Sequence, residues 1–299
     1  MPPPKVEATP RLLAPMRDAV HGQGKRLRPA LLMLVCETLG GPVEEALPVA
    51  AAIELMHNFT LVHDDIIDHD DLRRGGPTIR KKWGDDIALL TGDSLLGTRS
   101  PHLPLIAQRF TDAIIELCNG QALDCEFERR DDVTVAAYLD MIAGKTARLF
   151  SLCAEIGARL ASATEPQIKL LRQFGEQLGL GFQVQDDLLD ITVAQKILGK
   201  DFGSDVRRRK RTFLYVHVMT HGAPRYRECL QKLFQKPEIL PTDILTAQRI
   251  FYESGAIVAA DTAMRRRLQQ ARHCLGELES MVLTNELSEL IDTIARRNM

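Results

Sequence analysis

The sequence predicts an all-α protein. Apolar residues recur at helical spacing along almost the whole chain, as in ALLMLVCETL, and alternating strand-like patterns are scarce. Proline and glycine interrupt this pattern at intervals typical of helix boundaries. No Gly/Ser-rich linker divides the 299 residues, which favours a single domain over residues 1–299.

The expected helices follow from these boundaries. The first opens near Pro29 and closes at Gly40, with proline at its start and glycine at its end. The second covers about 43–71, and a loop, RRGGP, follows at 73–77. A third is expected at 85–96, before the prolines of 98–104 break the chain. The remaining helices are expected at 107–128, 135–160, 165–190, 212–221, 225–233, 243–254, 257–281 and 287–297.

An acidic pattern, Asp-Asp-x-x-Asp, occurs twice, each time at the end of an apolar helical segment. The copies are Asp64, Asp65 and Asp68 in HDDIIDHDDLRRG, and Asp186, Asp187 and Asp190 in FQVQDDLLD. Residues i and i+4 are neighbours on a helix, and like charges there cost roughly 0.2–0.5 kcal/mol per pair. Solvated helix ends are the alternative for one copy, but two copies favour bound cations. Carboxylate oxygens suit a hard cation such as Mg²⁺, which commonly shares its shell with substrate phosphates.

Basic residues near both acidic motifs indicate an anionic ligand. Lys25 and Arg28 stand at i and i+3 in GKRLRP, just before a helix. Others follow the acidic motifs or interrupt a helix: Arg73, Arg74, Lys145 beside Thr146, Lys200 and Lys210. Arginine binds phosphate in a bidentate manner and lysine acts as a point charge. A metal site and a separate basic site would suit two phosphorylated substrates.

Composition excludes several other classes of protein. The net charge is −2, with 38 basic and 40 acidic residues, which argues against general nucleic-acid binding. The six cysteines have no metal-ligand spacing and indicate a reducing compartment. No apolar signal segment and no run of about 18 apolar residues is present, so we expect a cytoplasmic protein without a membrane span.

Seven motifs in order resemble the trans-isoprenyl diphosphate synthases, the polyprenyl synthetase family that includes farnesyl and geranylgeranyl diphosphate synthases. They are GKRLRP, HNFTLVHDDIIDHDDLRRGGPTI, TGDSLL, NGQALD, MIAGKTARLF, FQVQDDLLD and GKDFGSD. The resemblance covers about 24–212, whereas 213–299 matches only in helical character. It implies a helical bundle around a deep central cavity, usually homodimeric, that condenses isopentenyl diphosphate head to tail with an allylic diphosphate.

The resemblance also implies roles for individual residues. The metal ligands would be Asp64, Asp65, Asp68, Asp186 and Asp190, with Asp187 supporting them. They would hold Mg²⁺, three ions when substrate is bound, and Mn²⁺ would substitute. The allylic diphosphate would meet Arg73, Lys145, Thr146, Gln183 and Lys200, with Lys210 near it, and isopentenyl diphosphate would meet Lys25, Arg28, His57 and Arg74. Breaking the allylic C–O bond leaves charge that cations stabilise.

Phe59 is expected to set the product length. It lies five residues before Asp64, about 7.5 Å along the helix axis, in the direction in which the product chain must grow. Its neighbours Met56 and Thr60 are narrower. In similar family members, one aromatic residue at this position, without a second at the next, accompanies C20 products. The expected product is therefore geranylgeranyl diphosphate.

Two departures from the family pattern bear on function. The segment between Asp93 and Gly120 is about ten residues short, in a region that helps to form the family's dimer contact. Arginines at 207–209 replace an acidic-glycine step, and we expect 207–211 to bind an anion at the rim of the site. The alternatives are a farnesyl or longer-chain synthase, a head-to-head synthase, or a non-catalytic subunit of a heteromeric synthase.

Overall fold

Helices form almost all of the structure, which confirms the all-α prediction. The computed structural model describes residues 9–22, 24–96, 103–192, 202–278 and 281–296. Its longer helices are α1 (Pro10–His21), α2 (Leu27–Thr38), α3 (Val43–Ile67), α5 (Asp85–Leu96), α6 (Leu103–Phe127), α7 (Val135–Ile142), α8 (Arg148–Leu160), α9 (Glu165–Thr192), α12 (Phe213–His221), α13 (Pro224–Phe234), α14 (Pro241–Glu253), α15 (Ala256–Gly276) and α16 (Met281–Ala295).

Shorter elements connect these helices near the acidic motifs. They are α4 (Ile79–Trp83), the π-helix η1 (Ala143–Ala147) and α11 (Ser204–Arg207). Within the described ranges, the only strands are β1 (Leu72–Arg73) and β2 (Gly76–Pro77), which form an antiparallel hairpin directly after the first acidic motif.

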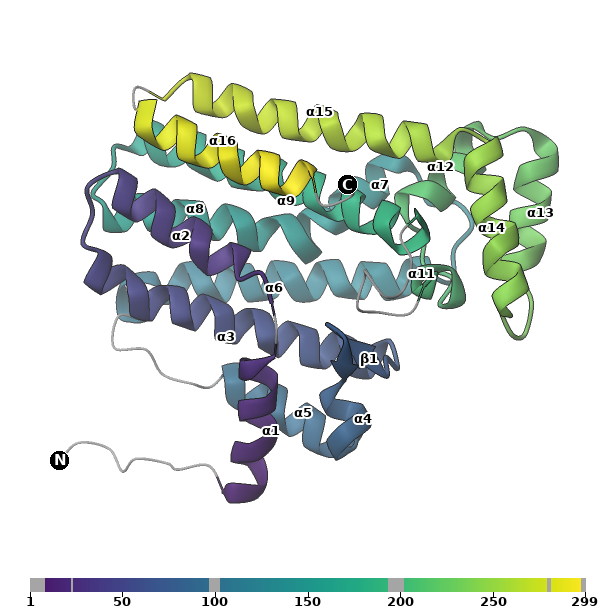
Figure 1. The fold of residues 1–299 in the computed structure, drawn as a ribbon, viewed down its shortest axis with the longest axis horizontal. Coiled ribbons are helices and arrows are strands. Elements are labelled where there is room, and N and C mark those ends of the chain that lie inside the picture. Colours follow the sequence, from purple (N-terminus) through teal and green to yellow (C-terminus); the bar gives the residue numbers. More distant parts are fainter. Residues whose placement is uncertain (1–8, 23, 97–102, 193–201, 279–280, 297–299) are drawn as a thin grey trace.

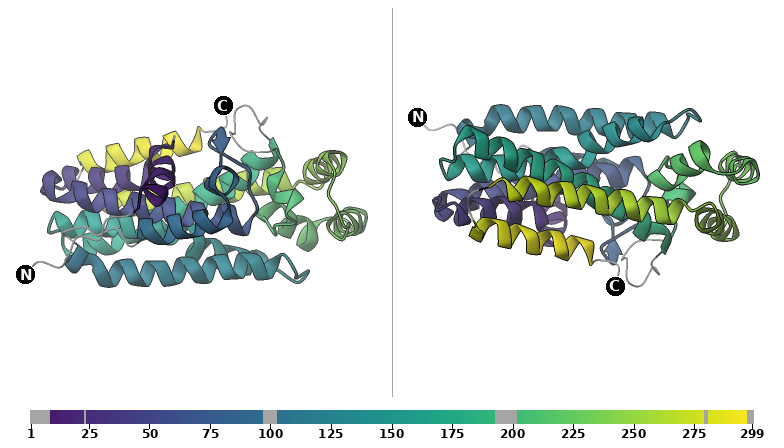
Figure 2. Two further views of the ribbon diagram at one scale, coloured as in Figure 1. Left: turned by 90° about the horizontal axis from the view of Figure 1, so that it is seen from below. Right: turned by 90° about the horizontal axis from the view of Figure 1, so that it is seen from above.

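The bundle is organised around α9, which packs against α8 and α15 (Figure 1). The helix α2 packs on α8 and α3, and α5 packs on the other side of α3. Figure 2 shows α6 along one outer edge of the bundle, while α13 and α14 project at one end. Both acidic motifs lie at the ends of long helices, α3 and α9, that belong to one core.

Glycines allow α9 to approach its neighbours closely. A Cβ atom on Gly175 would lie 2.6 Å from the carbonyl oxygen of Phe150, and one on Gly179 would lie 2.5 Å from the Cα atom of Ala147. Glycine costs about 1 kcal/mol relative to alanine in a helix. Close packing of α9 against α8 and η1, which positions the second acidic motif, offsets that cost.

Several boundaries differ from the sequence prediction. The sequence analysis predicted no helix before Pro29, yet α1 covers Pro10–His21, with Pro10 in the first turn, where proline is tolerated. For the same reason α6 begins at Leu103 and includes Pro104. The expected helix at 135–160 contains η1, and the expected 257–281 helix ends at Gly276. The segments 97–102 and 193–201 lie outside the described residues.

Across the parts of the chain that the structure describes, we find no helix with the length and apolar content required to cross a membrane.

Candidate active site

A cavity of about 980 Å³ lies among α2, α3, α6, η1 and α9. Its lining includes most of the residues singled out in the sequence: Lys25, Arg28, His57, Thr60, Asp64, Asp68, Arg73, Arg74, Lys145, Thr146, Gln183 and Asp186. Residues from 25 to 186 thus converge on one space. Lys200 lies outside the described residues.

The first acidic motif divides between the cavity and the protein interior. Asp64 and Asp68 line the cavity, whereas Asp65 is 3% exposed and forms an ion pair with Arg73. Burial raises the pKa of Asp65 to about 6, although Arg73 opposes this shift. Burial also raises the pKa of Asp64, against the opposing charge of Lys145. The motif therefore presents two poorly solvated carboxylates to the cavity.

In the second motif only Asp186 lines the cavity. Asp187 accepts hydrogen bonds from the Tyr138 hydroxyl at 2.7 Å, the Phe213 backbone N–H at 2.9 Å and the Gln183 amide at 3.1 Å. Asp190 accepts from the Ser204 hydroxyl at 2.7 Å and the Asp205 backbone N–H at 3.1 Å. Asp187 and Asp190 thus fasten α9 to α7, α12 and α11.

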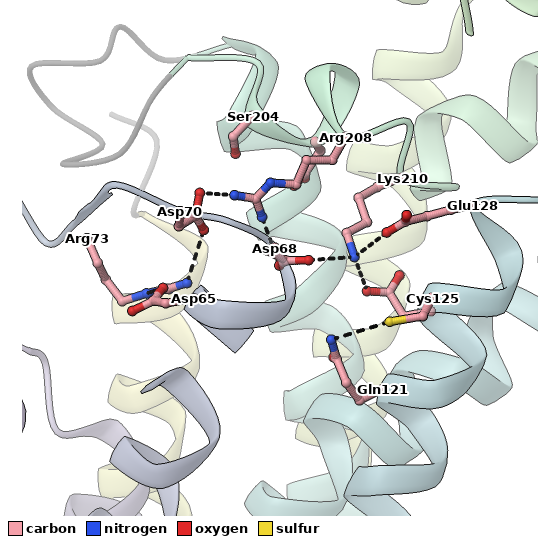
Figure 3. Close-up of polar contacts among 12 residues, drawn as sticks. Asp65, Asp68, Asp70, Arg73, Gln121, Cys125, Glu128, Ser204, Arg208 and Lys210 are labelled. Atoms are coloured by element: carbon pink, nitrogen blue, oxygen red, sulfur yellow. Dashed lines mark hydrogen bonds and ion pairs between the residues drawn. The ribbon is translucent and has the colours of Figure 1, made fainter. Parts of the chain in front are cut away.

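Two lysines and Asp124 connect α6, η1 and the segment after α11 beneath the first motif. Asp124 Oδ2 lies 2.6 Å from Lys145 Nζ and 2.9 Å from Lys210 Nζ. Lys210 also contacts Asp68 Oδ1 at 3.0 Å and Glu128 Oε1 at 2.8 Å (Figure 3). Burial alone would raise the pKa of Asp124, but the two lysines lower it to about 2. The motif NGQALD was noted in the sequence, but Asp124 was not assigned a role there.

The π-helix η1 places Lys145 and Thr146 on the cavity wall. Such bulges are frequent at functional sites. The backbone of α6 meets η1 closely, because a Cβ atom on Gly120 would lie 2.2 Å from the Lys145 backbone nitrogen. Thr146 donates its hydroxyl hydrogen to Gln183 Oε1 at 2.7 Å, which connects η1 to α9.

A second basic group lines the cavity near the start of α2. Arg28 Nη1 lies 3.0 Å from His57 Nε2, and the guanidinium stands 4.7 Å from the centre of the Phe150 ring. Within the described chain, the buried Nε of Arg28 has no hydrogen-bond partner. A donor of this kind is suited to an incoming anion. Burial and then the charge of Arg28 hold the pKa of His57 well below its usual value, so His57 is neutral.

The residues expected to control product length occupy different environments. Thr60 lines the cavity and donates its hydroxyl hydrogen to the His57 carbonyl at 2.8 Å. Phe59 does not line it, and its ring packs edge-on against His63 with centroids 4.6 Å apart. Met56 is buried in the core.

Comparisons with known proteins identify the family. Residues 9–250 match the family model for polyprenyl synthetase. The chain belongs to the polyprenyl synthetase family. A geranylgeranyl diphosphate synthase of Methanosarcina mazei is 38% identical over 251 residues, 81% of this chain and 76% of that protein. A short chain isoprenyl diphosphate synthase of Methanothermobacter thermautotrophicus is 33% identical over 96% of this chain and 90% of its own.

A solved structure agrees with this assignment. The polyprenyl synthase of Caulobacter crescentus, complexed with calcium and isoprenyl diphosphate, is 29% identical and superposes with a TM-score of 0.91 over 98% of this chain and 91% of that one. Among the residues that the structure describes, no group of three or more His, Cys, Asp or Glu side chains is arranged so that it could hold a metal ion without other ligands. The carboxylates of Asp64, Asp68 and Asp186 nevertheless line one cavity, and this oxygen donor set fits a hard cation that completes its shell with phosphate.

We expect Asp124→Asn to lower the free energy of unfolding of the metal-free protein by roughly 3 kcal/mol, because buried ammonium groups lose a counter charge. Asp64→Asn is the matched change at a carboxylate that lines the cavity. It should leave stability unchanged or raise it, because it removes a buried carboxylate beside Asp68. Urea denaturation measures both. Equal losses for the two variants would contradict the assignment of Asp124 as the structural member.

The pH dependence of stability should report the neutral state of His57. Its folded-state pKa is lowered, so below about pH 6.5 the unfolded chain binds a proton that the folded protein excludes. Stability should therefore fall as pH drops below about 6.5, by up to ~1.4 kcal/mol per pH unit from this residue. His57→Gln should lose less stability than the native protein between pH 7.5 and 5.5 in urea melts. Identical losses would show that His57 is not held neutral.

Proposed function

We propose that this protein is a divalent-metal-dependent prenyltransferase that condenses isopentenyl diphosphate with an allylic diphosphate and releases geranylgeranyl diphosphate. The observation that carries this proposal is the single cavity lined by Asp64, Asp68 and Asp186 together with two separate groups of cations. One cavity with two anion-binding ends suits a reaction that joins two diphosphates.

The two ends would bind different substrates. Near Asp64 and Asp68, Lys145 would contact the allylic diphosphate, with Arg73, Thr146 and Gln183 beside it and Lys210 behind Asp68. At the other end, Arg28 and His57 would hold isopentenyl diphosphate together with Lys25 and Arg74, without a metal. The unpartnered Nε of Arg28 supports this second site.

Asp64, Asp68 and Asp186 would hold the metal ions. When bound, Mg²⁺ would neutralise the charge that develops on the leaving diphosphate. The sequence analysis also expected Asp65, Asp187 and Asp190 at the metal site. We assign them a positioning role, because their oxygens accept hydrogen bonds or form ion pairs within the protein. Three ions per site and replacement by Mn²⁺ stay predictions.

The chain's own residues would bind, orient and shield the reacting groups. The allylic C–O bond breaks, its electron pair goes to the diphosphate, and Lys145 stabilises the new negative charge. The isopentenyl double bond attacks the resulting carbocation, a C–C bond forms, and the released diphosphate takes the proton. Apolar side chains of Leu61, Leu117 and Leu149 on the cavity wall would exclude water from the cation.

A C20 product is favoured over shorter or longer ones. Thr60 is a small residue on the cavity wall, so it leaves space that an aromatic ring at this position would fill, and such a ring would shorten the product. Phe59, the preceding residue, packs against His63 and would limit how far the product extends past Thr60. The expected contribution of Met56 is indirect, since it is buried in the core. Farnesyl and longer products are the alternatives. A non-catalytic subunit is disfavoured because both acidic motifs are complete.

A homodimer and a cytoplasmic location are the remaining expectations. Ile115, on the outer helix α6, is a large apolar residue with 55% of its surface exposed. It lies in the region that the family resemblance assigns to the dimer contact. Association of two chains through α6 would bury Ile115, which is favourable.

Condensation by the purified protein alone should require a divalent cation, since uncompensated carboxylates repel diphosphate. Chelation should abolish product formation, and Mg²⁺ should restore it. Asp64→Ala or Asp186→Ala should lower turnover by orders of magnitude with the fold retained. Asp71→Ala, an exposed acidic change outside the cavity, is the control and should stay active. Activity that survives complete chelation would refute the metal site.

Thr60→Phe should shift the product from C20 towards C15, because the ring enters the cavity. Thr60→Ser keeps the hydroxyl and should keep C20. Phe59→Ala should allow products of C25 or longer, with some stability lost from the cavity that it leaves. Chromatography of products from labelled isopentenyl diphosphate measures all three. An unchanged length in both Thr60→Phe and Phe59→Ala would exclude this wall as the length determinant.

Light scattering should give a particle of twice the 33.4 kDa chain mass. Ile115→Glu should shift the population towards monomer, because a charge would enter the interface. Leu245→Glu, a change at an equally exposed apolar residue of α14, should not. A native monomer, or equal effects of the two changes, would contradict the α6 interface.

A further inference from the structure

The guanidinium of Arg208 lies on the first acidic motif. Its Nη1 is 2.8 Å from Asp68 Oδ2, and its Nη2 pairs with Asp70 Oδ1. Figure 3 shows the side chain reaching from the segment after α11 to a position between the two carboxylates. Asp68, Asp70 and Arg208 all line the central cavity. An internal cation therefore occupies one of the carboxylates assigned to the metal.

The segment that carries Arg208 is fastened to the second acidic motif. The backbone N–H of Gly203 donates to the Asp190 carbonyl at 2.9 Å, and the Asp190 carboxylate accepts from Ser204 and Asp205. Because this segment is attached to Asp190 of the second motif, it places the Arg208 guanidinium at Asp68 of the first motif. The expectation that 207–211 would meet a substrate anion is thus answered differently for two of these residues, since Arg208 meets a carboxylate of the protein and Arg207 is exposed outside the cavity lining.

Both oxygens of Asp68 are occupied by protein cations. Lys210 contacts Oδ1 and Arg208 contacts Oδ2, and the Asp68 and Arg208 side chains are only 11% and 17% exposed. Water screens such a pair poorly. Lys210 is also held by Asp124 and Glu128, so its position does not depend on Asp68. A metal ion that binds Oδ2 of Asp68 must displace Arg208.

We propose that Arg208 is a built-in competitor of the metal, which leaves Asp68 when metal and diphosphate arrive together and then binds diphosphate oxygens. This inference rests on the proposed metal site at Asp64 and Asp68. Metal alone would displace the guanidinium from Asp68 and leave it with Asp70 only, without offering it a new anion. Diphosphate supplies that anion, and arginine binds phosphate in a bidentate manner. The two ligands would therefore each strengthen the binding of the other.

The experiment compares Mn²⁺ affinity with and without inorganic pyrophosphate, using the electron paramagnetic resonance signal of free Mn²⁺. Arg208→Gln removes the competitor. Arg207→Gln removes the same charge from the same turn, at an exposed residue outside the cavity lining, and is the control. Thermal melts check that both variants fold. Should Arg208→Gln not fold, Arg208→Lys replaces it, with the same direction of effect expected because one amine bridges two carboxylates less well.

We expect Arg208→Gln to bind Mn²⁺ about tenfold more tightly than the native protein in the absence of pyrophosphate, a change that corresponds to ~1.4 kcal/mol. The gain in Mn²⁺ affinity on adding pyrophosphate should be smaller in this variant than in the native protein. Arg207→Gln should resemble the native protein in both measurements.

Equal Mn²⁺ affinities in the native protein and Arg208→Gln, or equal shifts in the two variants, would overturn the competition while leaving the metal site intact. Failure of the native protein to bind Mn²⁺ even with pyrophosphate would instead overturn the proposed function, and this inference with it.

Discussion

Electrostatic repulsion among carboxylates is the constraint around which this structure is organised. Asp64, Asp68 and Asp186 face one cavity from the ends of two long helices, where apolar packing cannot compensate their charge. Two charges about 4 Å apart repel by ~4 kcal/mol at an effective dielectric constant of 20. The fold tolerates this arrangement because Lys145, Lys210 and other cations lie among the carboxylates.

Those cations are themselves held by residues that do not line the cavity. Asp124 fixes Lys145 and Lys210 from behind, and Asp65 fixes Arg73. The second motif uses Asp187 and Asp190 to fasten three other segments and leaves Asp186 for the cavity. A pattern of identical residues in the sequence thus separates into members that line the cavity and members that are bonded within the protein, and only the folded structure distinguishes them.

Much of this could be predicted from the sequence. Helical periodicity set the fold class, and motif order identified the residues that converge on the cavity. The division within each motif could not be predicted, because Asp186 and Asp187 are chemically identical and are distinguished by donors on other helices, such as Tyr138 and Phe213, that contact Asp187. Likewise, the RRRK sequence indicates an anion-binding segment. It does not show that Arg208 contacts Asp68, which lies 140 positions earlier in the chain.

The environment of Phe59 is a further case in which spacing was insufficient. The prediction rested on the distance of Phe59 along the helix axis, but Thr60 is the residue that lines the cavity, since neighbouring helical residues point about 100° apart. Phe59 packs on His63 four residues further along α3, a contact that helical spacing allows, whereas the face of α3 that borders the cavity depends on the neighbouring helices. Helix faces are therefore assigned reliably only once the neighbouring helices are known.

The central claim is that the two acidic motifs form one metal site through Asp64, Asp68 and Asp186. Anomalous diffraction from crystals grown with Mn²⁺ and inorganic pyrophosphate would test it most directly. The account predicts manganese peaks inside the central cavity, bonded to these three carboxylates and to pyrophosphate oxygens. Peaks confined to other carboxylates, or pyrophosphate bound in the cavity without manganese, would contradict it.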